Sequence, residues 1–119
     1  MAAPNILQVS TITGKTSVLA VTTTATDIVA NAASSGTVLK INAVIIANIN
    51  GTTPADVTID LFRGGVAYRL VSTIAVLQDS TFIALGRDYP LYLEEGDSLR
   101  LTASANSMLT GLCSYEVIS

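Results

Sequence analysis

Alternation of apolar and polar side chains is the clearest signal in the chain, and residues 37–49 show it best. Successive side chains of a β-strand point to opposite faces, so apolar residues at every second position predict a strand with one buried face. The apolar set of this segment is Leu39, Ile41, Ala43, Ile45, Ala47 and Ile49. We expect the segment to be a central strand of the core.

Shorter segments repeat this period of two, and none shows the sustained 3.6-residue period of a helix. The further strands are expected at residues 17–24, 26–31, 56–62, 66–77, 81–85, 90–93, 98–104 and 109–118. Turn-forming clusters separate them, at residues 32–36, 50–54, 63–65, 78–80, 94–97 and 105–107. Eight or nine strands with turns every eight to twelve residues predict an all-β, single-domain antiparallel β-sandwich, jelly-roll or Greek-key like.

The predicted core consists of the apolar residues that alternate within these strands. They are Leu39, Ile41, Ile45, Val57, Ile59, Leu61, Leu99, Leu101 and Val117. On the last strand, the inward face is expected to carry Leu109, Cys113, Tyr115 and Val117.

Residues 1–16 are expected to form an extended N-terminal arm ahead of a sandwich domain at residues 17–119, because Pro4 and Gly14 interrupt the pattern. The arm carries apolar side chains that need cover, namely Ile6, Leu7, Val9 and Ile12. An extended segment can add its backbone to the open sheet edge of a neighbour, so these four residues are the predicted interface. The alternative is that the arm folds back on its own domain or frays.

Composition supports an interaction protein. Of the 119 residues, 50% are hydrophobic and 13% are charged, and the mean hydropathy is +0.56, which indicates apolar surface that a partner covers. The alternative is that alanines on the surface raise the mean hydropathy. The net charge of −3 gives no basic excess, so no nucleic-acid partner is expected. The apolar runs are too short and too polar to span a membrane, and the first residues do not read as a signal peptide, so we expect synthesis in a cytoplasm.

Candidate catalytic chemistry is sparse. The chain has no histidine and a single cysteine, Cys113, so it can form neither a Ser-His-Asp triad nor a Cys/His zinc site. Glu94, Glu95 and Asp97 cluster in one segment, but we expect an exposed acidic turn with too few ligands for calcium. Gly14-Lys15-Thr16 lacks the earlier glycine of a phosphate-binding loop. The sequence therefore predicts no enzyme, cofactor or metal.

The remaining charged and aromatic residues form no obvious site. Four arginines are scattered over strands and turns: Arg63, Arg69, Arg87 and Arg100. They make no basic stripe of the kind that binds nucleic acid. The four tyrosines, Tyr68, Tyr89, Tyr92 and Tyr115, are expected to be half-buried strand residues, although tyrosines can also stack on sugars or bases.

Three segments of the last third resemble small virion proteins of tailed bacteriophages, a group common in phages of marine and freshwater bacteria, cyanophages included. They are Tyr-Leu-Glu-Glu-Gly-Asp-Ser-Leu at residues 92–99, Leu-Thr-Ala-Ser-Ala-Asn-Ser at 101–107, and Cys-Ser-Tyr-Glu-Val-Ile-Ser at 113–119. Residues 1–5, 11–16 and 40–48 also resemble that group. The chain departs from it at Val117, where a second glutamate is common.

The resemblance implies a non-enzymatic structural protein of the virion, made in the host cytoplasm and used in many copies. The expected role is capsid decoration (cement), which stabilises the head by binding between capsid subunits, with a homotrimer as the expected assembly. Its partners would be other copies of itself and the major capsid protein or tail proteins. The alternatives are a tail, baseplate or fibre component that binds a receptor or carbohydrate, and a carbohydrate-binding sandwich of cellular origin.

Overall fold

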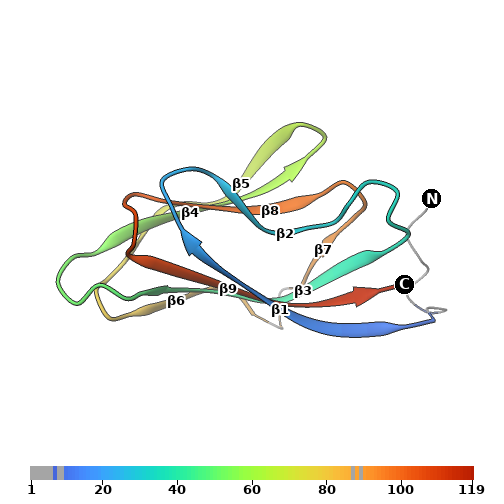
Figure 1. Cartoon of the computed structure of the whole chain (residues 1–119), viewed down its shortest axis with the longest axis horizontal. Helices are drawn as coiled ribbons and strands as arrows, with labels where there is room; N and C mark the ends of the chain where they lie inside the picture. The colour runs from blue at the N-terminus through green and yellow to red at the C-terminus, as the bar shows by residue number, and fades with distance from the viewer. Residues whose placement is uncertain (1–6, 8–9, 87, 89) are drawn as a thin grey trace.

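The computed structural model describes residue 7, residues 10–86, residue 88 and residues 90–119, and these form nine β-strands and no helix (Figure 1). In chain order the strands are β1 (Ile12–Val21), β2 (Thr26–Ala30), β3 (Val38–Asn48), β4 (Ala55–Arg63), β5 (Val66–Val76), β6 (Thr81–Leu85), β7 (Leu91–Leu93), β8 (Ser98–Ala103) and β9 (Leu109–Ile118).

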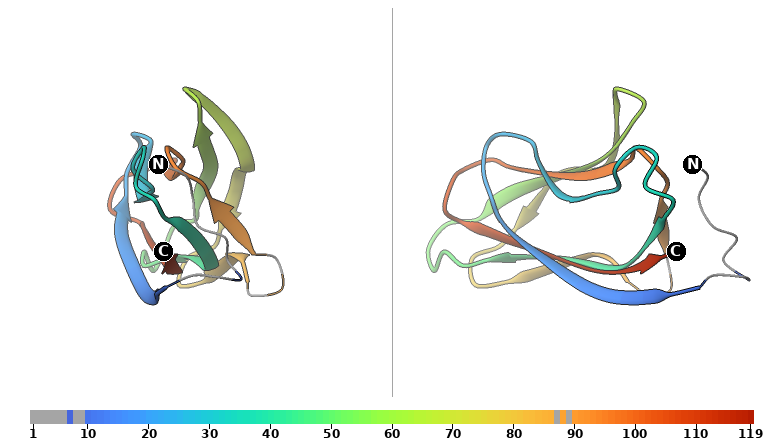
Figure 2. Two further views of the ribbon diagram at one scale, coloured as in Figure 1. Left: turned by 90° about the vertical axis from the view of Figure 1, so that its right-hand side faces the viewer. Right: turned by 45° about the vertical axis from the view of Figure 1, so that its right-hand side comes forward.

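The strands form two packed antiparallel sheets, seen end-on in the left view of Figure 2. Sheet A has the order β1-β9-β3-β6, with β7 pairing the other end of β3, and sheet B has the order β2-β8-β4-β5. Because β6 and β7 occupy the same side of β3, they act as one interrupted strand, and each sheet has four columns. This order is that of a jelly roll. The predicted all-β sandwich is therefore confirmed.

The core lies between the two sheets and contains most of the predicted residues. Leu39 is buried, Ile41, Val57, Ile59, Leu99 and Leu101 are fully buried, and Leu61 and Val117 pack against this cluster at its margin. Strand β9 approaches sheet B so closely that any side chain at position 111 would force the buried Leu101 to shift. A Cβ atom there would lie 2.5 Å from Leu101 Cδ1.

The prediction for Ile45 is wrong, because β3 changes phase along its length. The register with β9 shifts between Ile41 and Ala43, so that Asn42 is an extra residue in the ladder. Such a bulge moves every following side chain to the opposite face. Val44 and Ile46 are consequently buried, whereas Ile45 is only half-buried on the outer face of sheet A.

Strand β1 begins inside the segment predicted to be an arm. Ile12 to Thr16 pair with Ile118 to Ser114 in continuous register, so these five residues belong to sheet A. The backbone of Thr11 extends this pairing, because its N–H and C=O both bond to Ser119, at N···O distances of 2.9 and 3.0 Å. The predicted interface residues Ile6 and Val9 lie outside the described residues.

Candidate functional site

The acidic turn between β7 and β8 is built around Arg63 at the end of β4. Asp97 is buried and accepts hydrogen bonds from Arg63 Nε at 2.9 Å, from Arg63 Nη2 at 2.5 Å and from the Glu94 N–H at 2.8 Å. Glu94 forms a second ion pair with Arg63 at 2.7 Å. The expectation of an exposed acidic turn is thus wrong for Asp97, whose partner lies 34 residues earlier in the chain.

These contacts make Asp97 a structural anchor. Its hydrogen bonds to Arg63 lower the pKa of the Asp97 carboxyl against the opposing effect of burial, and the same bonds raise the pKa of Arg63. Glu95 ties the turn to the β2–β3 loop by accepting a hydrogen bond from the Gly36 N–H at 3.0 Å. The turn therefore fastens three loops at one end of the sandwich.

An open cleft of about 510 Å³ lies over this turn, lined by Arg63, Gly64, Glu94, Glu95, Gly96 and Asp97. Its carboxylates are already engaged in the contacts just described. In the described part of the chain, no group of three or more acidic or cysteine side chains is arranged to hold a metal ion. Nor does any helix there have the length and apolarity to cross a bilayer.

Cys113 lies on the inward face of β9, as predicted, and is fully buried. Burial raises the pKa of the Cys113 thiol to about 12. Since the thiolate is the reactive form of cysteine, this side chain behaves as a small core residue.

The outer face of sheet B carries a row of alternating charges that crosses all four strands. The register places Asp27 of β2 opposite Arg100 of β8, Arg100 opposite Asp60 of β4, and Asp60 opposite Arg69 of β5. Asp27 accepts a hydrogen bond from Arg100 Nε at 2.9 Å, and Asp60 accepts one from Arg69 Nε at 3.0 Å. Arg100 also stacks on the Phe62 ring, 3.6 Å from its centroid. The charges of this face are therefore satisfied within the chain.

The sandwich is open along the seam where the edge strand β5 faces β6. A small groove of about 80 Å³ enters the core there, lined only by apolar side chains: Val44, Ile59, Leu70, Val71, Ala84 and Leu85. Val66, Tyr68, Leu70 and Ile74 are exposed large residues on β5 itself.

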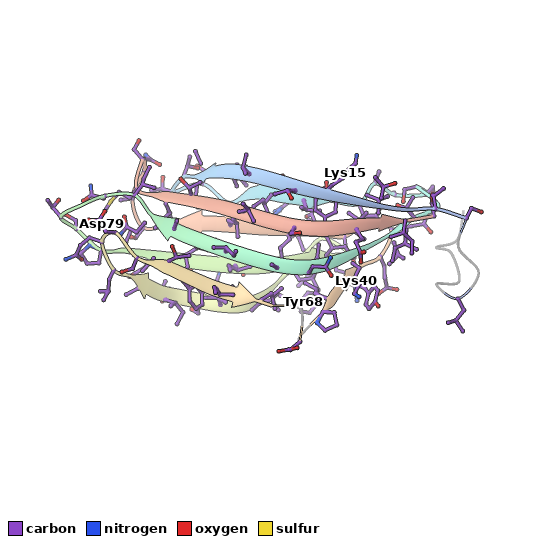
Figure 3. All side chains as sticks on the ribbon, turned by 90° about the horizontal axis from the view of Figure 1, so that it is seen from below. Lys15, Lys40, Tyr68 and Asp79 are labelled. Atoms are coloured by element: carbon purple, nitrogen blue, oxygen red, sulfur yellow. The ribbon has the colours of Figure 1, made fainter. Side chains whose placement is uncertain are left out.

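Tyr68 illustrates why this seam is unusual. It pairs with Leu61, whose side chain packs against the core, so Tyr68 projects from the inner face of sheet B. Its side chain nevertheless remains 52% exposed and lies at the margin of the sandwich in Figure 3. An inner sheet face that stays accessible to solvent is a candidate docking surface, because large contiguous apolar patches usually mark interaction sites.

The sequence did not identify this seam. Alternation along β5 predicted a strand, but whether its inner face would be covered depends on how far β6 extends beneath it. Of the four residues predicted to form an interface, the structure describes two. Leu7 is 89% exposed, and Ile12 is a residue of β1 that is 57% exposed.

No protein-family model matches the chain, and no curated protein matches it. Among solved structures, it is similar to a protein of the Bacillus endospore appendages, which are described as a novel family of disulfide-linked pili. The TM-score is 0.53 at 21% identity, covering 100% of this chain and 96% of that one. A similarity at this level of identity concerns the fold, and it agrees with two packed antiparallel sheets.

Proposed function

We propose that the chain is a non-enzymatic structural protein of a tailed-phage virion, a capsid decoration protein that stabilises the head by binding between capsid subunits. The observation that carries this proposal is the open apolar seam of β5 and β6. The groove and the exposed β5 side chains offer a partner both an apolar pocket and a strand edge, the two elements that recognition by strand addition uses.

Two further observations support the proposal. The resemblance of residues 92–99, 101–107 and 113–119 to phage virion proteins points to a particle built from many copies. The protein of similar fold is described as part of a family of pili, and the proposal gives this chain a structural role of the same general kind.

The direct test is an electron-microscopy map of the particle. Density that fits this sandwich at regular lattice positions between capsid subunits is the expected result. Its absence from the whole particle would overturn the proposal.

A binding assay on particles that lack the protein tests the seam itself. Leu70→Asp places a charge in the mouth of the groove, and we expect at least a tenfold loss of particle binding. Ile49→Asp makes the same change at another exposed aliphatic residue, in the β3–β4 loop and away from the groove, and should bind as the unaltered protein does. Equal binding by both variants would remove the seam from the proposal.

The second candidate is a tail, baseplate or fibre component that binds a receptor carbohydrate. The exposed rings of Tyr68 and Tyr92 favour it, since aromatic faces stack on sugars. Density at the tail instead of the head, together with glycan binding that is lost in Tyr68→Ala, would select this role.

A further inference from the structure

The outer face of sheet A differs from that of sheet B in carrying an aliphatic row. The register places Val18 of β1 opposite Leu112 of β9, Leu112 opposite Ile45 of β3, and Ile45 opposite Ile83 of β6. The two ends of the row, Val18 and Ile83, are 69% and 65% exposed. Figure 3 looks directly onto this face, with β1, β9, β3 and β6 side by side.

The rows on either side are small and uncharged. One consists of Thr16, Ser114 and Ala43, and the other of Ala20, Thr110, Ala47 and Thr81. All of these residues are exposed or half-buried. The result is a flat, neutral surface on one side of the sandwich, whereas the opposite side carries the paired charges of sheet B.

Beyond the row of Thr16, Ser114 and Ala43 lies a polar row, which crosses the four columns of sheet A. It contains Gly14 of β1, Glu116 of β9, Lys40 of β3 and Tyr92 of β7. Nothing lies within 4 Å of the position that a Cβ atom of Gly14 would occupy, so the surface is open to solvent at that end of the row. Tyr92 supplies a bulky exposed ring at the other end.

These rows match themselves under a two-fold axis that runs along the strands between β9 and β3. The rotation exchanges the columns, so that β1 faces the β6–β7 column of a second copy and β9 faces its β3. Val18 then lies opposite Ile83, Leu112 opposite Ile45, and Glu116 opposite Lys40. Tyr92 comes to lie opposite Gly14, which has no side chain to obstruct the ring. Apolar groups meet apolar groups, opposite charges meet, and the tyrosine ring meets a residue without a side chain.

We propose that the outer face of sheet A binds a second copy of this chain in this two-fold arrangement. The sheets of the two copies have the same twist, and packing of sheets with their strands closely aligned is a common arrangement of stacked sheets. The inference rests on the register of sheet A and not on the proposed place in a virion, since it uses neither the seam of β5 nor any particle component.

The size of the face predicts a weak dimer. Four columns about 4.8 Å apart, the three long strands extending about ten residues at about 3.3 Å per residue and β6 with β7 covering most of that length, present roughly 600 Å² per copy. Stable interfaces bury about 800 Å² per partner, and the smallest are transient. We therefore expect a dissociation constant on the order of micromolar for the dimer.

The test introduces charged side chains at Val18 and Ile83, which lie on opposite edges of sheet A. Within one copy they are separated by three strand spacings, about 14 Å, so charges there are largely screened from each other at physiological salt. In the proposed dimer they meet twice. V18K/I83K brings lysines together and should give a monomer, whereas V18K/I83E pairs lysine with glutamate and should keep the dimer. I49K, at an equally exposed site off this face, is the matched control.

The measured quantity is the mass of the full chain, from sedimentation or light scattering, at protein concentrations of about 1–200 µM. This range brackets the expected dissociation constant. Far-ultraviolet spectra and melting curves verify that each variant is folded. The expected masses at the high end are twice 12.3 kDa for the unaltered chain, V18K/I83E and I49K, and 12.3 kDa for V18K/I83K. A monomeric or trimeric unaltered chain, or equal masses for the two double variants, would overturn the proposal. If Leu70→Asp loses particle binding but still forms the dimer, the proposal of a two-fold dimer is retained.

Discussion

The phase change in β3 predicts opposite consequences for two neighbouring isoleucines. Ile46 is fully buried in the core, whereas Ile45 is half-buried on the outer face of sheet A. Replacing each by alanine removes the same three carbon atoms. The two variants therefore differ only in where those atoms lie, which makes them a matched pair.

The magnitudes follow from burial. Removing three carbons at about 0.8 kcal/mol each costs about 2.4 kcal/mol for full burial, and the cavity left in the core raises the cost of Ile46→Ala to about 3–4 kcal/mol. At Ile45 about half of the transfer energy is lost, roughly 1 kcal/mol, and solvent refills the space. We thus expect Ile46→Ala to be about 2 kcal/mol less stable than Ile45→Ala.

Urea unfolding measures this difference, and at about 2 kcal/mol per molar denaturant it separates the two midpoints by about 1 M. The measurement belongs in the V18K/I83K background, so that any loss of self-association by Ile45→Ala does not contribute. Equal midpoints, or a lower midpoint for Ile45→Ala, would refute the bulge at Asn42 and restore the uninterrupted alternation expected from the sequence.

Three further predictions concern single residues. Asp97→Asn should lower the free energy of unfolding by about 1–2 kcal/mol at pH 7, a value discounted for the partial exposure of Arg63. Because folding lowers the pKa of Asp97, the contribution of its carboxylate is complete above the unfolded pKa of 3.8 and is lost as the pH falls through the folded pKa. The urea-unfolding curves of the two proteins should therefore converge below pH 3.8. Gly111→Ala should destabilise by about 1–3 kcal/mol in urea unfolding, since the new methyl group collides with the buried Leu101, and a stabilised variant would contradict the close sheet contact. Cys113 should resist a thiol reagent at pH 8 in the folded protein and react at once in denaturant, and rapid labelling of folded protein would show that the strand opens.

Alternation predicted the strands because it depends on local geometry, and it located the core wherever only one face of a strand is apolar. Strand β8 is such a case, with Leu99 and Leu101 inward and Arg100 outward. Strand β3 is not, because Val44, Ile45 and Ile46 are all aliphatic and the pattern fits either phase. An outward-facing aliphatic side chain such as Ile45 is therefore mistaken for core, and the same mistake conceals the neutral face to which it belongs.

The candidate sites depend on contacts between distant segments, and the sequence could not supply them. Asp97 is buried only because β4 brings Arg63 to it from 34 residues away. The aliphatic row of sheet A combines one residue from each of four strands and becomes visible only when their register is known. The lack of histidine and the single cysteine, in contrast, limit the available chemistry whatever the fold.

The position of β9 in sheet A has a consequence for biosynthesis. β9 lies between β1 and β3 and is the last strand of the fold to be translated. Until residues 109–118 have left the ribosome, β1 has no neighbour in its sheet, one edge of β3 is unpaired, and the apolar face of β8 lacks the strand that packs against Leu101. Pairing between the first and last strands is slow to form because it closes a long loop, and exposed strand edges promote aggregation meanwhile. A translational pause just before residue 109 would therefore leave an aggregation-prone nascent chain that needs chaperone binding. A pause in β1 or β2 would expose far less apolar surface.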